Sequence, residues 1–150
     1  MDLERTCEPI KILMIEDNLG DVRLTQEILK EARVRNILSF VKDGDDAMDY
    51  LHKTGKFSDA VRPDLILLDL NLPKVNGLDV LVNIKSDPDL RAIPVVILTT
   101  SEAETDILTG YQRYANAYIT KPVGLDPFNQ IIQAFEGFWL ETVRLPKQVA

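Results

Sequence analysis

Cysteine, histidine and tryptophan each occur only once in the 150 residues, and no apolar run is long enough to cross a membrane. A spanning helix needs about 20 consecutive apolar residues. The opening residues, MDLERTCEP, are polar and do not resemble a signal peptide. Because Cys7 has no second cysteine with which to pair, an internal disulfide is excluded, as is usual in a reducing cytoplasm. We therefore expect a cytoplasmic protein without a membrane segment.

An excess of positive charge is also missing. Lysine and arginine number 17 against 24 aspartate and glutamate residues, which gives a net charge of −7. This balance disfavours nucleic-acid binding through a generally basic surface. The content of 45% hydrophobic and 27% charged residues is typical of one globular domain. We expect a leader at 1–9, a domain at 10–144 and a tail at 145–150.

Apolar runs typical of strands alternate along the chain with segments of helical period. We predict five strands at 10–17, 37–44, 65–68, 93–100 and 117–120, and five helices at 20–34, 45–55, 77–87, 103–116 and 126–144. Such alternation favours parallel strands joined by right-handed crossovers, with helices on both faces of the sheet. The predicted fold is therefore α/β, a doubly wound five-stranded parallel sheet of the flavodoxin type.

Polar side chains follow four of the predicted strands where each strand ends. They are Glu16 and Asp17, Asp69, Thr99 and Thr100, and Lys121. In an open parallel sheet, sites form beyond the carboxyl ends of the strands at a topological switch point. Any one polar residue at a strand end is weak evidence, but four ends with complementary chemistry predict a site.

The residue types indicate which chemistry such a site supports. Crowded carboxylates raise one another's pKa unless a cation lies among them. Oxygen ligands without thiolate or imidazole favour Mg²⁺ over zinc. Lysine and threonine are suitable donors to a transferred phosphoryl group, and an aspartate carboxylate is a competent nucleophile. The set predicts Mg²⁺-assisted phosphoryl transfer to Asp69.

The chain resembles the receiver domains of two-component response regulators over about residues 10–140. The motifs that carry the resemblance are IEDN at 15–18, LLDLNLPKVNG at 67–77, VVILTTS at 95–101 and AYITKP at 117–122. A finer similarity, to the small cyanobacterial phytochrome-associated response regulators, makes a phytochrome a candidate kinase. The resemblance implies a stand-alone phosphoacceptor protein that acts through an unknown downstream partner, rather than an enzyme.

The resemblance also assigns an acceptor and a metal site. Asp69 would take the phosphoryl group from a sensor histidine kinase. Asp17, Asp69 and the backbone carbonyl of Asn71 would ligate Mg²⁺, and Glu16 would act directly or through water. Many receivers have two aspartates where this chain has Glu16 and Asp17, so the part of Glu16 stays open.

Three further residues receive roles from the same resemblance. Thr99 would hydrogen-bond the phosphoryl group, and Lys121 would bridge that group to the acidic pair. Tyr118 would be the aromatic residue that reorients with Thr99 on activation. The peptide bond before Pro122 would be cis, a form that X–Pro bonds tolerate.

Two other functions remain as alternatives. One is a pseudo-receiver that has kept the fold and signals by docking alone; phosphorylation by acetyl phosphate distinguishes it. The other is a haloacid-dehalogenase-like phosphatase. Such an enzyme needs a second aspartate two positions after the nucleophile, where this chain has Asn71.

The last predicted helix is apolar over an unusually wide arc. Phe138 and Trp139 follow the stripe that covers the sheet, and Leu140 falls off the stripe defined by Ile131 and Phe135. Helices that are apolar around much of their circumference are buried on more than one side. We therefore expect a homodimer through the face formed by the fourth helix, the fifth strand and the fifth helix.

His52 is expected to lie on the solvated surface.

Overall fold

The computed structural model describes residues 8–147. Most of the expected leader, including Cys7, and the end of the expected tail lie outside this range. Within it, five strands alternate with five α-helices. The strands are β1 (Ile10–Ile15), β2 (Asn36–Val41), β3 (Leu65–Leu68), β4 (Val95–Thr99) and β5 (Ala117–Thr120). The α-helices are α2 (Leu19–Lys30), α3 (Gly44–His52), α4 (Gly77–Ser86), α5 (Glu104–Gln112) and α6 (Leu125–Phe135).

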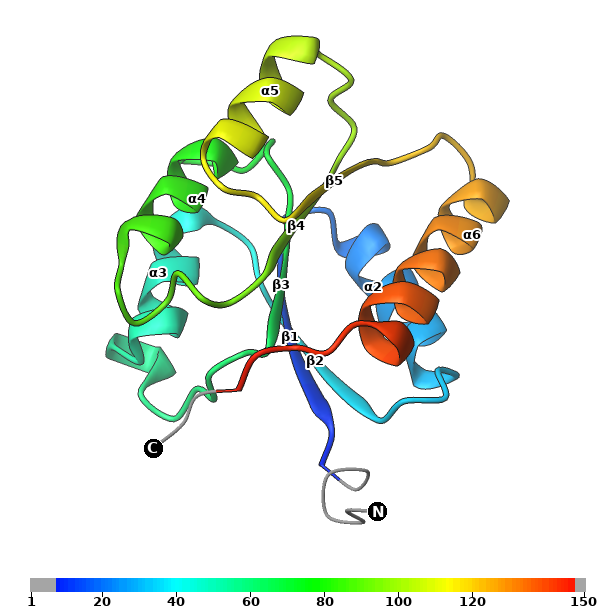
Figure 1. Ribbon diagram of the computed structural model, residues 1–150, viewed down its shortest axis with the longest axis horizontal. Helices are drawn as coiled ribbons and strands as arrows, with labels where there is room; N and C mark the ends of the chain where they lie inside the picture. The colour runs from blue at the N-terminus through cyan, green and yellow to red at the C-terminus, as the bar shows by residue number, and fades with distance from the viewer. Residues whose placement is uncertain (1–7, 148–150) are drawn as a thin grey trace.

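All five strands are parallel and lie in the order β2-β1-β3-β4-β5. Helices α3, α4 and α5 cover one face of the sheet, and α2 and α6 cover the other (Figure 1). This arrangement confirms the predicted doubly wound α/β fold. The chain reverses its direction of winding between β1 and β3, so the switch point lies at the carboxyl ends of these two strands.

The core has one apolar cluster on each face of the sheet. Alternate residues of the strands supply both, because successive side chains of a strand point to opposite faces. In β3, Ile66 and Leu68 pack towards α4, whereas Leu65 and Leu67 pack towards α2 and α6. All four are at most 1% exposed. Burial on both faces explains why β3 is apolar throughout its length.

Side-chain caps define where three of the helices begin. Asn18, Asp43 and Asn76 each accept a hydrogen bond from a backbone N–H of the helix that follows. Such residues satisfy donors that the first helical turn leaves free. These caps lie in the loops after β1, β2 and β3, so they fix the chain where it leaves the carboxyl edge of the sheet.

The end of the last helix differs from the prediction. After α6, residues Glu136–Thr142 form a π-helix, η2, rather than a continued α-helix. The wider turn places Leu140 on the same side as Ile132 and Phe135, and it is only 4% exposed. Leu140 therefore belongs to the core, and the prediction that it falls off the buried stripe and widens the apolar arc was wrong. Phe138 is 54% exposed and packs edge-on against Trp139.

Beyond η2 the chain crosses the amino-terminal edge of the sheet, towards α3 and α4 (Figure 1). Leu145 packs against the core cluster beneath α2 and α6. Lys147 forms an ion pair with Glu8 at 3.2 Å. None of the helices among residues 8–147 combines the length and apolar character that crossing a membrane requires.

Candidate phosphoacceptor site

The carboxyl edge of the sheet brings together the side chains singled out in the sequence. Parallel pairing aligns the strand ends: the N–H of Asp69 bonds the carbonyl of Ile15 at 3.0 Å, and the N–H of Lys121 bonds that of Thr99 at 2.7 Å. The resulting polar cluster is unusually well buried. Glu16, Asp69, Thr99 and Lys121 are all at most 7% exposed.

Three carboxylates meet at this edge. Oxygen atoms of Glu16, Asp17 and Asp69 lie within 4.8 Å of one another, and Asp17 is the exposed member. An all-oxygen donor set with one solvent-facing member fits Mg²⁺, which keeps several waters and few protein ligands. The predicted residues therefore lie where one divalent cation would contact them together.

Lys121 supplies the only ammonium among these acids in the described part of the chain. Its Nζ contacts Oε1 of Glu16 directly and lies 2.9 Å from Oδ2 of Asp21. The distance to Oδ2 of Asp69 is longer, at 3.6 Å. Burial lowers the pKa of Lys121, but the hydrogen bonds to Glu16 and Asp21 outweigh burial and the pKa is raised overall. Lys121 is therefore a permanent cation of the site.

Glu16 is the most deeply buried acid of the cluster, at 1% exposure. Burial, followed by its hydrogen bond with Asp69, raises the pKa of Glu16 to about 8, although Lys121 acts in the opposite direction. Its second carboxylate oxygen accepts a hydrogen bond from the N–H of Asn18 at 3.3 Å. Both oxygens thus have protein partners, so a metal that bound Glu16 directly would compete with Lys121.

Asp21 belongs to the same cluster but was not singled out in the sequence. It lies in the first turn of α2, and its carboxylate contacts Lys121, the residue that directly follows β5. The helix after β1 begins at the carboxyl edge of the sheet, where the strand ends. An acid in its first turn was therefore the sequence signal that could have identified Asp21 as a site residue. With Asp21, four carboxylates face one ammonium, so the site has a net charge of −3 when all five groups are ionised.

Asn71 lies over the acceptor. Its N–H donates to Oδ1 of Asp69 at 3.3 Å, and its side-chain amide donates to the hydroxyls of Thr99 at 3.5 Å and Thr100 at 3.3 Å. The side chain thus bridges β3 and β4 across the mouth of the site. The assignment of its carbonyl oxygen to the metal stays a prediction.

Tyr118 connects the site to α5. Its hydroxyl donates to the carbonyl of Ser101 at 3.0 Å, and the Ser101 hydroxyl donates to Asp106 of α5 at 2.6 Å. A Cβ at Gly110 would lie 3.4 Å from the Tyr118 ring and 3.0 Å from Ile97, so the glycine leaves room for the ring beneath α5. Tyr118 is therefore tied to the loop that follows Thr99.

The backbone of Asp69 is held by a close approach of α4. A Cβ on Gly77 would lie 2.3 Å from the carbonyl oxygen of Asp69 and 2.6 Å from Cα of Leu70, and the Gly77 N–H bonds the carbonyl of Leu70 at 3.0 Å. Only glycine fits at this contact.

The predicted cis bond before Pro122 is absent: residues 8–147 contain no cis peptide bond. The trans form is the one that X–Pro bonds favour, by about 0.5–1 kcal/mol.

His52 lies far from this cluster. It is exposed, as expected, and its Nε2 lies 2.8 Å from Oδ2 of Asp87. The hydrogen bond to His52 is the main cause that lowers the pKa of Asp87. This pair joins α3 to the end of α4 and takes no part in the site.

Comparison with known proteins agrees with the geometry. Residues 12–133 match the model of the response regulator receiver domain. The chain is 47% identical over 138 residues to response regulator Rcp1 of Synechocystis sp., a match that covers 92% of this chain and 94% of that protein. It is 36% identical over 147 residues to the probable methanogenesis regulatory protein FilR2 of Methanothrix harundinacea, covering 97% and 93% of the two chains.

Two solved structures are similar throughout. The Mn²⁺-bound form of Rcp1 has a TM-score of 0.90 at 47% identity, and covers 93% of this chain and 100% of its own. The phosphorylated cyanobacterial phytochrome response regulator RcpA also has a TM-score of 0.90, at 49% identity, with the same coverage. One of these relatives thus holds a divalent cation and the other a phosphoryl group.

Proposed function

Because the chain belongs to the response regulator receiver family, we propose that it accepts a phosphoryl group on Asp69 from a sensor histidine kinase. The observation that carries the proposal is the buried juxtaposition of Asp69 with one ammonium and a three-acid metal cluster. Receiver domains act as signalling modules, so the product of this reaction is a changed surface rather than a released metabolite. The domain occupies 10–144 in this proposal, with the leader and tail outside it.

The residues divide the chemistry among them. A carboxylate oxygen of Asp69 attacks the phosphorus of phosphohistidine; a P–O bond forms, the P–N bond breaks, and the kinase imidazole leaves with the bonding pair. Glu16, Asp17, Asp69 and Asn71 would hold Mg²⁺. When bound, this ion offsets the negative charge that the acids and the phosphoryl group share. Lys121 and the Thr99 hydroxyl donate hydrogen bonds to the phosphoryl oxygens.

Intact-mass measurement after incubation with acetyl phosphate and Mg²⁺ tests this function. Wild type should gain one phosphoryl group, with acetate as the leaving group, and the isosteric Asp69→Asn should gain none. A wild-type chain that stays unmodified would instead support a pseudo-receiver. Equal yield on Asp69→Asn would move the acceptor to another residue.

Conversion of the signal to a new surface is assigned to Thr99 and Tyr118. The hydroxyl of Tyr118 is bonded to the loop that begins after Thr99, so a shift of Thr99 towards the phosphoryl group pulls on the acceptor of that bond. Lys121→Ala should therefore take up phosphate slowly and fail to change the surroundings of Tyr118. Tyrosine-selective NMR before and after phosphorylation measures this; an unaltered Tyr118 response in Lys121→Ala contradicts the assignment.

The kinase partner has an apolar surface available beside the site. Leu19 at the start of α2 is 52% exposed, Val123 before α6 is 98% exposed, and Leu125 at the start of α6 is 66% exposed. Contact between Asp21 and Lys121 brings these two segments together. A phytochrome is the candidate kinase, supported by the similarity to RcpA. Val123→Asp should slow transfer from a phytochrome kinase but leave labelling by acetyl phosphate unchanged; equal slowing of both reactions contradicts this docking surface.

A homodimer through α5, β5 and α6 is the second part of the proposal. β5 is an edge strand. Beside it, Leu108 and Tyr111 of α5 and Tyr114 in the turn that follows are 59%, 49% and 74% exposed. The support now comes from these side chains and from Phe138, because Leu140 is buried. Light scattering should give twice the chain mass for wild type and one chain mass for Tyr111→Lys. A wild-type monomer at high concentration, with and without phosphorylation, refutes the dimer.

The cellular location in this proposal is the cytoplasm, where a histidine kinase presents its phosphohistidine. Direct binding to nucleic acid is not part of the function. The downstream partner is a protein that recognises the switched surface.

A further inference from the structure

We propose that Asp21 is a positioning residue that holds the Lys121 ammonium away from Asp69 and thereby weakens the phosphorylated state. The inference rests on the proposed function of Asp69, and it concerns an acid outside the three-residue metal cluster. Its effect is regulatory: Asp21 and the phosphoryl group compete for one cation.

The distances around Lys121 show an unequal division of its hydrogen bonds. An ammonium has three N–H donors. In this site one reaches Glu16 and one reaches Asp21 at 2.9 Å, whereas Oδ2 of Asp69 lies beyond hydrogen-bond range at 3.6 Å. Of the three acids that pair with Lys121, the acceptor carboxylate of Asp69 is thus the most distant.

The backbone of Asp21 is fixed on both sides of its side chain. Its N–H donates to Oδ1 of Asn18 at 3.1 Å, and its carbonyl accepts from the Thr25 hydroxyl at 2.7 Å. Thr25 is fully buried, so this second bond is protected from water. The first turn of α2 therefore presents the Asp21 carboxylate to Lys121 from a rigid position.

The contact between Asp21 and Lys121 is also shielded from solvent. The Lys121 side chain is 5% exposed and that of Asp21 is 25% exposed. Charge-assisted hydrogen bonds are stronger than neutral ones, and partial burial preserves that strength. Because Oδ2 of Asp69 lies 3.6 Å from the ammonium, Lys121 must move towards Asp69 to bring its third N–H to the new oxygens, and that movement weakens its bond to Asp21. An uncharged residue at position 21 removes that cost.

Beryllofluoride, a phosphoryl analogue that binds the acceptor without chemical turnover, provides an equilibrium test. Its dissociation constant is measured by ¹⁹F NMR in the presence of MgCl₂. Asp21→Asn should bind it about five- to tenfold more tightly than wild type, the scale of one ordinary net hydrogen bond, because the neutral amide oxygen still competes for Lys121 as a weaker acceptor. Asp21→Glu keeps the charge and should stay within about twofold of wild type, since the acid still competes.

Asp45→Asn is the matched control. Asp45 is an exposed acid in the first turn of α3, so this variant changes the net charge equally without touching Lys121. The measurements are repeated in about 1 M NaCl, where the Debye length falls to about 3 Å and long-range charge effects vanish. The gain for Asp21→Asn should persist there. Thermal unfolding checks each variant, and Asp21→Ser replaces Asp21→Asn if the latter does not fold.

Two results overturn the inference. One is binding by Asp21→Asn that is unchanged or weaker relative to Asp45→Asn; the other is a gain that disappears in high salt. Failure of the wild type to bind beryllofluoride at all refutes the proposed function instead. The two failures are therefore distinguishable.

Discussion

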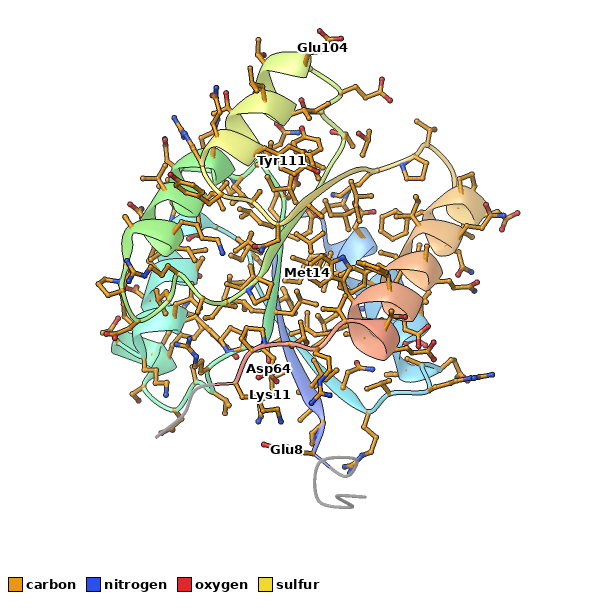
Figure 2. The ribbon with its side chains drawn as sticks, viewed as in Figure 1. Glu8, Lys11, Met14, Asp64, Glu104 and Tyr111 are labelled. Carbon is orange, nitrogen blue, oxygen red and sulfur yellow. The ribbon has the colours of Figure 1, made fainter. Side chains whose placement is uncertain are left out.

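The two edges of the sheet differ in the burial of their charged side chains. At the carboxyl edge, Glu16 and Lys121 are buried and depend on each other. At the amino edge, Glu8 and Lys147 form an ion pair while each side chain stays more than half exposed. Figure 2 shows Glu8, Lys11 and Asp64 gathered at this second edge, with Met14 of β1 nearer the middle of the sheet.

The contacts at the amino edge are satisfied by the protein itself. The N–H of Lys11 donates to Oδ2 of Asp64 at 2.9 Å, and the N–H of Asp64 donates to the carbonyl of Lys11 at 2.7 Å. The carboxyl edge instead has more carboxylates than cations. A buried excess of one charge is costly in the absence of a ligand, and binding a ligand relieves that cost. The difference indicates that one edge serves function and the other serves stability.

The largest effect is expected where a buried charge loses its partner. Lys121→Met should lower the free energy of unfolding by about 3 kcal/mol in metal-free buffer, because it leaves Glu16 and Asp69 without an ammonium. Lys147→Met, at the other edge, should change it by less than about 0.5 kcal/mol. Urea unfolding measures both. Equal losses would show that the two edges do not differ.

The next effect comes from the close approach of α4 to the acceptor strand. Gly77→Ala should cost about 2–3 kcal/mol of stability and slow phosphoryl uptake, because the added methyl group collides with the backbone of Asp69 and Leu70. Gly137→Ala is the control: the nearest atom to its Cβ is Oε2 of Glu141 at 4.0 Å, and no loss is expected. Full activity of Gly77→Ala would mean that the acceptor backbone is not held by this contact.

A smaller effect is expected from Mg²⁺, with a dependence on pH. Since the folded-state pKa of Glu16 is raised to about 8, Glu16 favours folding below its ordinary pKa of 4.5. That contribution is lost as the pH rises through about 8. Mg²⁺ competes with the proton on the Glu16 carboxyl. The increase in the free energy of unfolding that Mg²⁺ causes should therefore grow from pH 6 to pH 9, to about 1–2 kcal/mol.

Melting temperatures with MgCl₂ and with EDTA measure this effect. Asp17→Asn should lose the Mg²⁺ response at both pH values, and Asp64→Asn, at the opposite edge, should keep it. A wild-type response that is the same at both pH values would separate Glu16 from metal binding.

The smallest effect concerns the amino edge alone. Asp64→Ala removes the acceptor of the Lys11 N–H and should cost about 1 kcal/mol, the usual net value of one hydrogen bond. Phosphoryl uptake from acetyl phosphate should be unchanged, because Asp64 directly precedes β3, at the opposite end of that strand from Asp69. If Asp64→Ala folds normally but is phosphorylated slowly, the amino edge also affects the phosphoacceptor site, and the proposed division between a functional edge and a stabilising edge is wrong.

Much of the site followed from local pattern. Apolar runs in β1, β3 and β4 each end in a polar residue, and parallel pairing brings strand ends together at one edge. Asp69 and Lys121 were predicted from that rule, and the structure brings them together. The family motifs then added Tyr118 and Asn71, which strand periodicity does not distinguish from packing residues.

The parts that pattern did not predict depend on contacts between distant segments. Periodicity assigns Leu140 to the outside of a straight α-helix, but burial of Leu140 against the core accompanies a π-helix over Glu136–Thr142. Asp21 has the sequence context of an ordinary acid in a first helical turn. Only the packing of α6 against α2 brings Lys121, in the loop between β5 and α6, to it. Sequence by itself thus determined the parallel sheet and the polar edge, because side-chain alternation is a short-range property of the strand. Tertiary structure decided which acids share the one ammonium, since that depends on ångström-scale distances between residues 100 positions apart.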